Sequence, residues 1–220
     1  MSGIILLIIV GAVVYYKMLN TPDVRLVKEL SRGKTEEQAK VITYFVQKNR
    51  WKKNLSDDEY LSLVRKKCDS LKLKERALGK IGLDEDQVNE ISPAMFEGFV
   101  FDNAYAKKSA NGEWVSSSYQ VSWVFFGSEQ IYLYAYTLNM DDDNKKERTD
   151  EFFYRDVTSF STASETETAK DNEGKQIKVD SNKFALVVPG DKLYLSMDGV
   201  KDSESIIQGV KQKLREKKSL

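Results

Sequence analysis

The uncharged N-terminal run is the feature that most constrains this chain. Residues 1–16 contain no acidic or basic side chain, and residues 3–16 read GIILLIIVGAVVYY. A helix over residues 1–19 would be about 28 Å long, against roughly 30 Å for the hydrocarbon core of a bilayer. Lys17 follows the run, where its amine can reach the headgroups, and Tyr15 and Tyr16 suit the interface. The sequence therefore predicts a transmembrane anchor over residues 1–19.

Two alternatives to the anchor fit these residues less well. A cleaved signal peptide needs a positive segment before the apolar run and a small-x-small site after it. No Lys or Arg precedes Ile4, and residues 15–23 contain no such cleavage site. A buried core helix of a globular domain usually has a polar side, and this run has none.

Charge sets the expected orientation of the anchored protein. Residues 17–53 contain ten Lys or Arg and four Asp or Glu, whereas only Met1 and Ser2 precede the apolar run. Because the basic flank of a membrane span stays inside, we expect a single-pass protein of the cell membrane with its C-terminal bulk in the cytoplasm. The only cysteine, Cys68, cannot form an internal disulfide, which agrees with a reducing compartment.

Residues 20–93 have the pattern of several short helices. Thr21-Pro22 indicates a helix start, and two capping boxes follow, at residues 35–38 (TEEQ) and 56–59 (SDDE). Apolar residues behind each box recur at helical spacing. Such stripes favour amphipathic helices that pack on each other, and a lipid-facing surface or a partner-binding groove is the alternative. Cys68 lies on one stripe and is expected to be a small core residue.

From residue 95 the apolar period changes from 3.6 to 2. Asn111-Gly112 is a hairpin signal, and further turns are expected at residues 140–144, 171–174 and 189–190. About seven strands in hairpin succession follow from this pattern, including strands at residues 119–125, 131–136, 151–160, 162–170, 177–179, 184–188 and 192–197. A final helix from residue 202 or 203 carries the apolar stripe Ile206, Ile207, Val210 and Leu214. The expected fold class is α+β, with this helix closing an open end of the sheet.

Three segments of the β region resemble bacterial pleckstrin-homology-like (PH-like) domains. They are EFFYRDVTSFS at residues 151–161, VPGDKLYLSMDG at residues 188–199 and DSESIIQGVKQKLREKK at residues 202–218. The resemblance covers residues 95–217. It implies a split seven-stranded β-sandwich or barrel over residues 94–220, capped by a C-terminal helix. It also implies no catalytic residues, and several members of this family are tethered to membranes.

The first hairpin loop departs from the lipid-binding members of the wider superfamily. Those members place several Lys or Arg there, whereas this loop offers only Lys107 and Lys108 before Asn111-Gly112. Lys107 and Lys108 are therefore the candidate ligand or lipid contacts of this loop, and ordinary solvated charge is the favoured interpretation of them.

The composition weighs against several classes of function. The chain has no histidine, which excludes histidine-based triads and imidazole metal ligands, and its 34 basic residues balance 34 acidic ones, which disfavours nucleic-acid binding. The acidic turn at residues 141–144 (DDDN) lacks the glycine and terminal glutamate of an EF-hand loop. Tyr132, Tyr134 and Tyr136 lie on one strand face without interleaved basic residues, so a core or a protein contact is expected for them. No cofactor or metal site is predicted.

These observations lead to one main functional hypothesis and one alternative. The first is a membrane-anchored, non-enzymatic protein whose cytoplasmic PH-like domain mediates protein contacts or acts as a scaffold. The alternative is a binder of lipid or a small ligand at the open end of the barrel, with Lys107 and Lys108 as contacts. An enzyme that uses Asp, Glu or Tyr ranks third.

Overall fold

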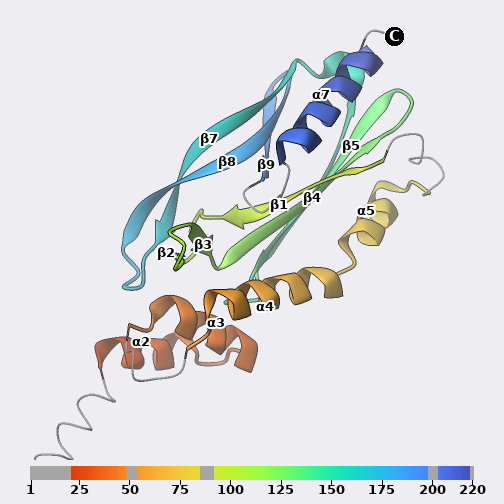
Figure 1. The fold of residues 1–220 in the computed structure, drawn as a ribbon. Helices are drawn as coiled ribbons and strands as arrows, with labels where there is room; N and C mark the ends of the chain where they lie inside the picture. Colours follow the sequence, from red (N-terminus) through yellow and green to blue (C-terminus); the bar gives the residue numbers. More distant parts are fainter. Residues whose placement is uncertain (1–20, 49–53, 85–91, 198–202, 219–220) are drawn as a thin grey trace, which may run out of the picture.

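The computed structural model describes residues 21–48, 54–84, 92–197 and 203–218. The predicted anchor, residues 1–19, lies outside these ranges. None of the helices within them is both long and apolar enough to cross a membrane. The described part is α+β, as expected. Figure 1 shows the first three described helices at the opposite end of the molecule from the C-terminal helix, and the fourth beside the β region.

Within the described residues, four helices precede the strands: α2 (Pro22–Leu30), α3 (Glu36–Val46), α4 (Asp57–Ser70) and α5 (Leu73–Ile81). Both predicted capping boxes are present, at the starts of α3 and α4. Helix α5 runs through Gly79 and ends at Gly82, whose φ of 76° is left-handed. A glycine adopts that conformation at little cost, so Gly82 is an effective helix stop.

Nine strands in the described part of the chain form three antiparallel sheets, so the expected count of about seven was too low. The first sheet has the order β1-β4-β5-β6, formed by β1 (Ala94–Val100), β4 (Ser118–Phe126), β5 (Gln130–Asn139) and β6 (Lys145–Phe153). The second is β7-β8-β9, formed by β7 (Ser159–Lys170), β8 (Gln176–Val188) and β9 (Asp191–Ser196). A hairpin of β2 (Ala106–Lys108) and β3 (Trp114–Ser116) is the third. The described strands do not close into a barrel.

Two predicted strand boundaries were wrong. Residues 151–160 are not one strand, because β6 ends at Phe153 and a 3-10 turn, η1 (Tyr154–Asp156), carries the chain from the first sheet to the second. The turn is fixed by Tyr154, whose hydroxyl donates to the carbonyl of Gly127 at 2.9 Å and whose N–H donates to the carbonyl of Glu129 at 3.1 Å. Residues 177–179 and 184–188 belong to a single strand, β8.

Strands β4 and β5, at the centre of the first sheet, are buried on both faces. Tyr134 and Tyr136 on β5 belong to a core shared with α3, α4 and α5, which confirms the expectation of a core role for this aromatic face. Ile131 and Leu133, which point to the other face, belong to a second core with Phe184 and the C-terminal helix. Successive side chains of β5 therefore alternate between two apolar cores, whereas in many antiparallel sheets they alternate between a core and solvent.

Helix α7 (Ser203–Lys218) packs on the second core. Ile207, Val210 and Leu214 are 3%, 3% and 1% exposed, which confirms three of the four residues of the predicted stripe. The side chain of Ile206 lies outside the described part. Figure 1 shows the helix at the upper end of the two main sheets, in the position of a cap.

Candidate functional site

A groove of about 720 Å³ lies between α3, α4 and the segment that precedes α4. Ala39, Leu55 and Leu63 contribute apolar side chains to its lining, and Thr43 lies among them. Asn54 donates a hydrogen bond to the carbonyl of Thr43 at 3.2 Å, which ties the segment before α4 to α3. The groove is thus bounded by two helices and a short connecting segment, a geometry that suits an extended or helical occupant.

Charged side chains form the rim of this groove. Glu36 and Lys40, one helical turn apart on α3, make an ion pair at 2.7 Å, and both are largely exposed. The hydrogen bond from Lys40 lowers the pKa of Glu36, so the pair stays ionised near neutral pH. Glu59 lines the groove from α4, and its carboxylate accepts the N–H of Ser56 at 2.8 Å. With Lys40 already paired, the rim carries an acidic excess.

A capping box stabilises the first turn of each of the two helices. In α3, Thr35 and Gln38 exchange hydrogen bonds of 3.2 and 2.9 Å between side chain and backbone, and Ser56 and Glu59 do the same in α4. Gln38 also donates from Nε2 to Asp143 at 2.8 Å, which joins the first turn of α3 to the turn between β5 and β6. Capping of this kind stabilises a helix start by about 1 kcal/mol.

Aromatic side chains on the inner faces of α3 and α4 fix the groove to the β domain. The rings of Tyr44 and Tyr60 stack at 4.6 Å between centroids, and Tyr60 stacks on Phe99 of β1 at 6.3 Å. Tyr60 is fully buried, and its hydroxyl donates to the carbonyl of Ser116 at 2.5 Å. The outer faces of the same helices are left to line the groove.

Asp57 joins both helices to the hairpin of β2 and β3. It accepts the hydroxyl of Tyr44 at 2.6 Å and the N–H of Ala110 at 2.7 Å. Burial disfavours ionisation of Asp57, but these hydrogen bonds outweigh it and lower the pKa of the carboxyl. Asp57 therefore remains a charged acceptor at the contact between the helices and the hairpin.

The two lysines expected to contact a ligand lie in different environments. Lys107 is half-buried; its ammonium donates to the carbonyl of Tyr44 at 3.0 Å and lies 3.2 Å from the centre of the Tyr44 ring. Burial lowers the pKa of Lys107, and nearby Asp57 opposes that effect. Lys108 is exposed, 5.5 Å from the centre of the Trp114 ring. Neighbours along a strand point to opposite faces, so the pair is not brought together.

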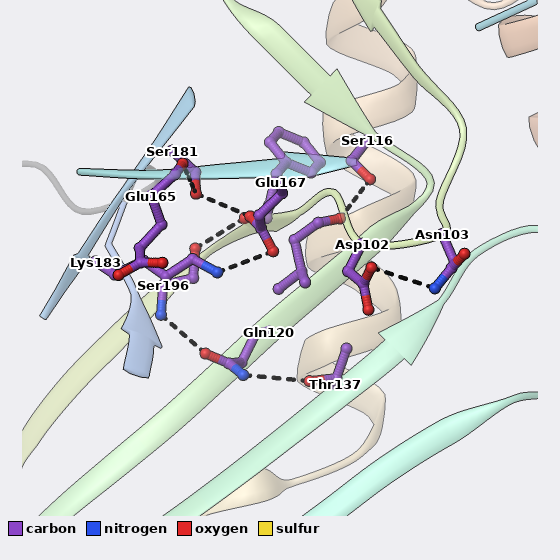
Figure 2. Close-up of polar contacts among 12 residues, drawn as sticks. Asp102, Asn103, Ser116, Gln120, Thr137, Glu165, Glu167, Ser181, Lys183 and Ser196 are labelled. Atoms are coloured by element: carbon purple, nitrogen blue, oxygen red, sulfur yellow. Dashed lines mark hydrogen bonds and ion pairs between the residues drawn. The ribbon is translucent and has the colours of Figure 1, made fainter. Parts of the chain in front are cut away.

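Polar residues also join the two main sheets, as Figure 2 shows. Gln120 on β4 accepts the N–H of Ser196 at 2.8 Å and donates to Thr137 at 3.3 Å. The hydroxyl of Ser196 donates to the carbonyl of Phe99 at 2.9 Å, which links β9 to β1. These bonds hold β9 against the first sheet.

An ion pair on the second sheet lies close to these bonds (Figure 2). Glu167 and Lys183 are 2.9 Å apart, and their side chains are only 10% and 13% exposed. The hydroxyl of Ser181 donates to Glu167 at 2.8 Å. A carboxylate and an ammonium buried in this way must satisfy each other, so a role in holding β7 to β8 accounts for them.

The three carboxylates of the acidic turn between β5 and β6 lie in different environments. Burial raises the pKa of Asp141, whereas Asp142 accepts hydrogen bonds from Asn139 and Asn144 that outweigh its own burial and lower its pKa. Asp143 accepts from Gln38 on α3. Within the described ranges, no group of three or more His, Cys, Asp or Glu is arranged to hold a metal ion. Cys68 is half-buried, and burial raises its pKa to about 12, so it is a poor nucleophile at neutral pH.

One network that the sequence did not predict attaches α5 to the first sheet. Arg76 donates two hydrogen bonds of 2.7 Å to the carboxylate of Glu147 on β6, and Tyr134 donates a third at 2.9 Å. The guanidinium of Arg76 also lies 5.3 Å from the centre of the Tyr136 ring. No local spacing relates positions that lie 71 residues apart, so only the fold could reveal this contact.

No family model, curated protein or solved structure matches this chain.

Proposed function

We propose that this chain is a membrane-anchored, non-enzymatic interaction protein whose groove between α3 and α4 binds a helix of a partner protein. The anchor is residues 1–19, and the helices and strands that follow lie in the cytoplasm. The observation that carries the proposal is the groove itself, about 720 Å³ in volume and bounded by two helices.

The β domain fits the PH-like architecture that the sequence resembles. A four-stranded sheet faces a three-stranded sheet, and a C-terminal helix packs at one end of both. The hairpin of β2 and β3 is then an insertion between the first two strands of the four-stranded sheet. This insertion is the part of the β domain that receives Tyr44 and Asp57 from the helices. We propose that the PH-like domain serves here as the platform on which the groove is built.

The shape and chemistry of the groove favour an amphipathic helix as its occupant. Helix α3 has 11 residues and is thus about 16 Å long, which matches two to three turns of a bound helix. Apolar side chains from both walls would cover small or aliphatic residues of the partner. Glu59, and Glu36 with its paired Lys40, favour a partner that carries Lys or Arg beside those residues.

Photo-crosslinking with the full-length protein in its native cells tests this proposal. A photoreactive amino acid replaces Ser62, which is exposed and lines the groove, or Thr168, which is exposed on β7. We expect a discrete adduct with one other protein from position 62 and none from position 168. Ala39→Arg, which fills the groove with a bulky cation, should reduce the adduct at least tenfold without changing the melting temperature, because a good helix former replaces another.

Three outcomes would contradict the groove as a binding site. They are the absence of an adduct from position 62, equal adducts from both positions, and an adduct that persists undiminished in Ala39→Arg. Glu36→Lys tests the partner's charge separately. It reverses the charge at this position of the α3 rim. We expect it to weaken the binding of a basic partner and to leave the binding of an uncharged partner unchanged.

A further inference from the structure

Exposed basic side chains lie on helix α2 and in the turn that ends it. Arg25 and Lys28 are three residues apart, and Arg32 follows four residues later in the turn that ends the helix. The i, i+3 spacing places Arg25 and Lys28 on one side of the helix, and Arg32 is exposed in the turn that follows. One acid, Glu29, is exposed beside them, so three bases face one acid. We call Arg25, Lys28 and Arg32 the basic stripe.

The opposite face of α2 fixes how the stripe is presented. Leu26, Val27 and Leu30 pack against the core that α3, α4 and α5 share with the first sheet. Since this apolar face is held on the protein, the basic stripe points away from it. Among the described residues, neither Lys28 nor Arg32 forms an ion pair with an acid, so their charges are available to an external surface.

The position of α2 in the chain indicates that the external surface next to the basic stripe is the membrane. This step rests on the anchor of the proposed function. Helix α2 begins at Pro22, three residues beyond the predicted end of the anchor, and three extended residues span at most about 11 Å. Electrostatic attraction extends over roughly 8 Å at physiological ionic strength. The first basic residues of α2 are therefore held within reach of the headgroups on the side of the membrane that we expect to be cytoplasmic.

We infer that the basic stripe of α2 binds the anionic headgroups of the membrane that holds the anchor. The cytoplasmic leaflet is rich in anionic lipid, and each Lys or Arg near such a surface adds to the attraction. The contact would turn the helical end of the molecule, including the groove, toward the membrane, while α7 at the other end faces away from it (Figure 1). A partner that binds the groove would then be met at the membrane surface.

Fluorescence quenching in vesicles tests this inference with the full chain. The protein carries Cys68→Ser and a dye at Glu29→Cys, beside the stripe, and the vesicles contain a lipid with a nitroxide on its headgroup. The vesicles are phosphatidylcholine alone or phosphatidylcholine with about 30% phosphatidylglycerol, in about 0.15 M salt. We expect quenching to be about twofold stronger in the anionic vesicles.

Two charge-reversed variants with the same change in net charge separate the stripe from general attraction. Lys28→Glu/Arg32→Glu should reduce quenching to the level of the neutral vesicles. Lys192→Glu/Arg215→Glu, which alters exposed residues of β9 and α7 at the other end, should leave it unchanged. Equal quenching in both kinds of vesicle, or an equal loss in both variants, would overturn the stripe as a lipid contact.

Flotation of the same samples tests the anchor separately. A chain that floats with neutral vesicles has its anchor, whatever the quenching shows about the stripe. A chain that floats only with anionic vesicles, and no longer does so with Lys28→Glu/Arg32→Glu, supports the stripe and contradicts the anchor. A chain that floats with neither contradicts both.

Discussion

At the residue scale, Tyr60 is the side chain on which the attachment of the helices most depends. It is fully buried, stacks between Tyr44 and Phe99, and donates its hydroxyl to the carbonyl of Ser116. Tyr60→Phe keeps the ring and leaves this carbonyl without that donor. We expect the free energy of unfolding to fall by about 1–2 kcal/mol, as measured by urea denaturation.

Tyr136→Phe is the matched control for this change. Tyr136 is also buried in the same core, but its hydroxyl forms no hydrogen bond with another described residue. Its loss should change the free energy of unfolding by less than about 0.5 kcal/mol. Equal effects of the two substitutions would show that the bond from Tyr60 to Ser116 adds nothing to stability.

The residues that sequence analysis identified correctly are those whose partners lie nearby in the chain. Thr35 and Ser56 bond three positions ahead, so their capping boxes were predictable from spacing alone. Tyr60 bonds 56 positions away, and its apolar stripe predicted burial but no partner. Lys107 shows the same limit, because its position on a hairpin suggested solvent or lipid, whereas the fold brings the Tyr44 ring to it.

At the element scale, α5 depends on one carboxylate. The hydrogen bonds from Arg76 outweigh burial and, with that from Tyr134, lower the pKa of Glu147 from an ordinary 4.5 to about 2. A lowered pKa stabilises the folded state above pH 4.5, and this contribution is lost as the pH falls toward 2. Glu147→Gln should therefore lower the free energy of unfolding by about 1–2 kcal/mol at pH 7. At pH 3, the free energies of unfolding of Glu147→Gln and the wild type, measured by urea denaturation, should lie closer together than at pH 7.

Glu151→Gln provides the control for α5, since Glu151 lies on the same strand and is exposed. We expect it to differ little from the wild type at either pH. A stability difference for Glu147→Gln that stays constant from pH 7 to pH 3 would contradict the role given to the ionised carboxylate.

The strands show why element boundaries were only partly predictable. Alternation correctly located β4 and β5. A strand buried on both faces, such as β5, has an unbroken apolar and aromatic run at residues 131–136, and such a run does not reveal which face is the core. The break at η1 was missed because residues 151–160 are rich in strand-forming residues. Only the transfer of the chain between two sheets requires a turn there.

At the scale of the whole molecule, the four-stranded sheet is shared by two cores. Phe99 and Tyr136 belong to the core under the helices, whereas Phe96 and Leu133 belong to the core under α7. The groove between α3 and α4 is a product of this arrangement, since it forms on helices whose inner faces are held by the sheet. Sequence patterns supplied its helices and left a groove as an alternative, but its volume and rim depend on packing between distant segments.

A shared sheet predicts that damage to one core is felt in the other. Leu214 on α7 is 1% exposed in the second core, and Leu214→Ala should cost about 2–5 kcal/mol. For a chain of this length, that cost corresponds to a fall in Tm of roughly 4–20 °C.

Far-UV circular dichroism follows the whole fold, whereas tryptophan fluorescence includes the signal of Trp123, which stacks on Phe125 at the first core. Both signals should shift by the same amount and melt together, because one sheet carries both cores. Arg215→Ala, at an exposed neighbouring position, should leave both melts within about 0.5 kcal/mol of the wild type. If Leu214→Ala moved the dichroism melt and left the fluorescence melt in place, the helices and the α7 end would be independent units, and the sheet would not couple them.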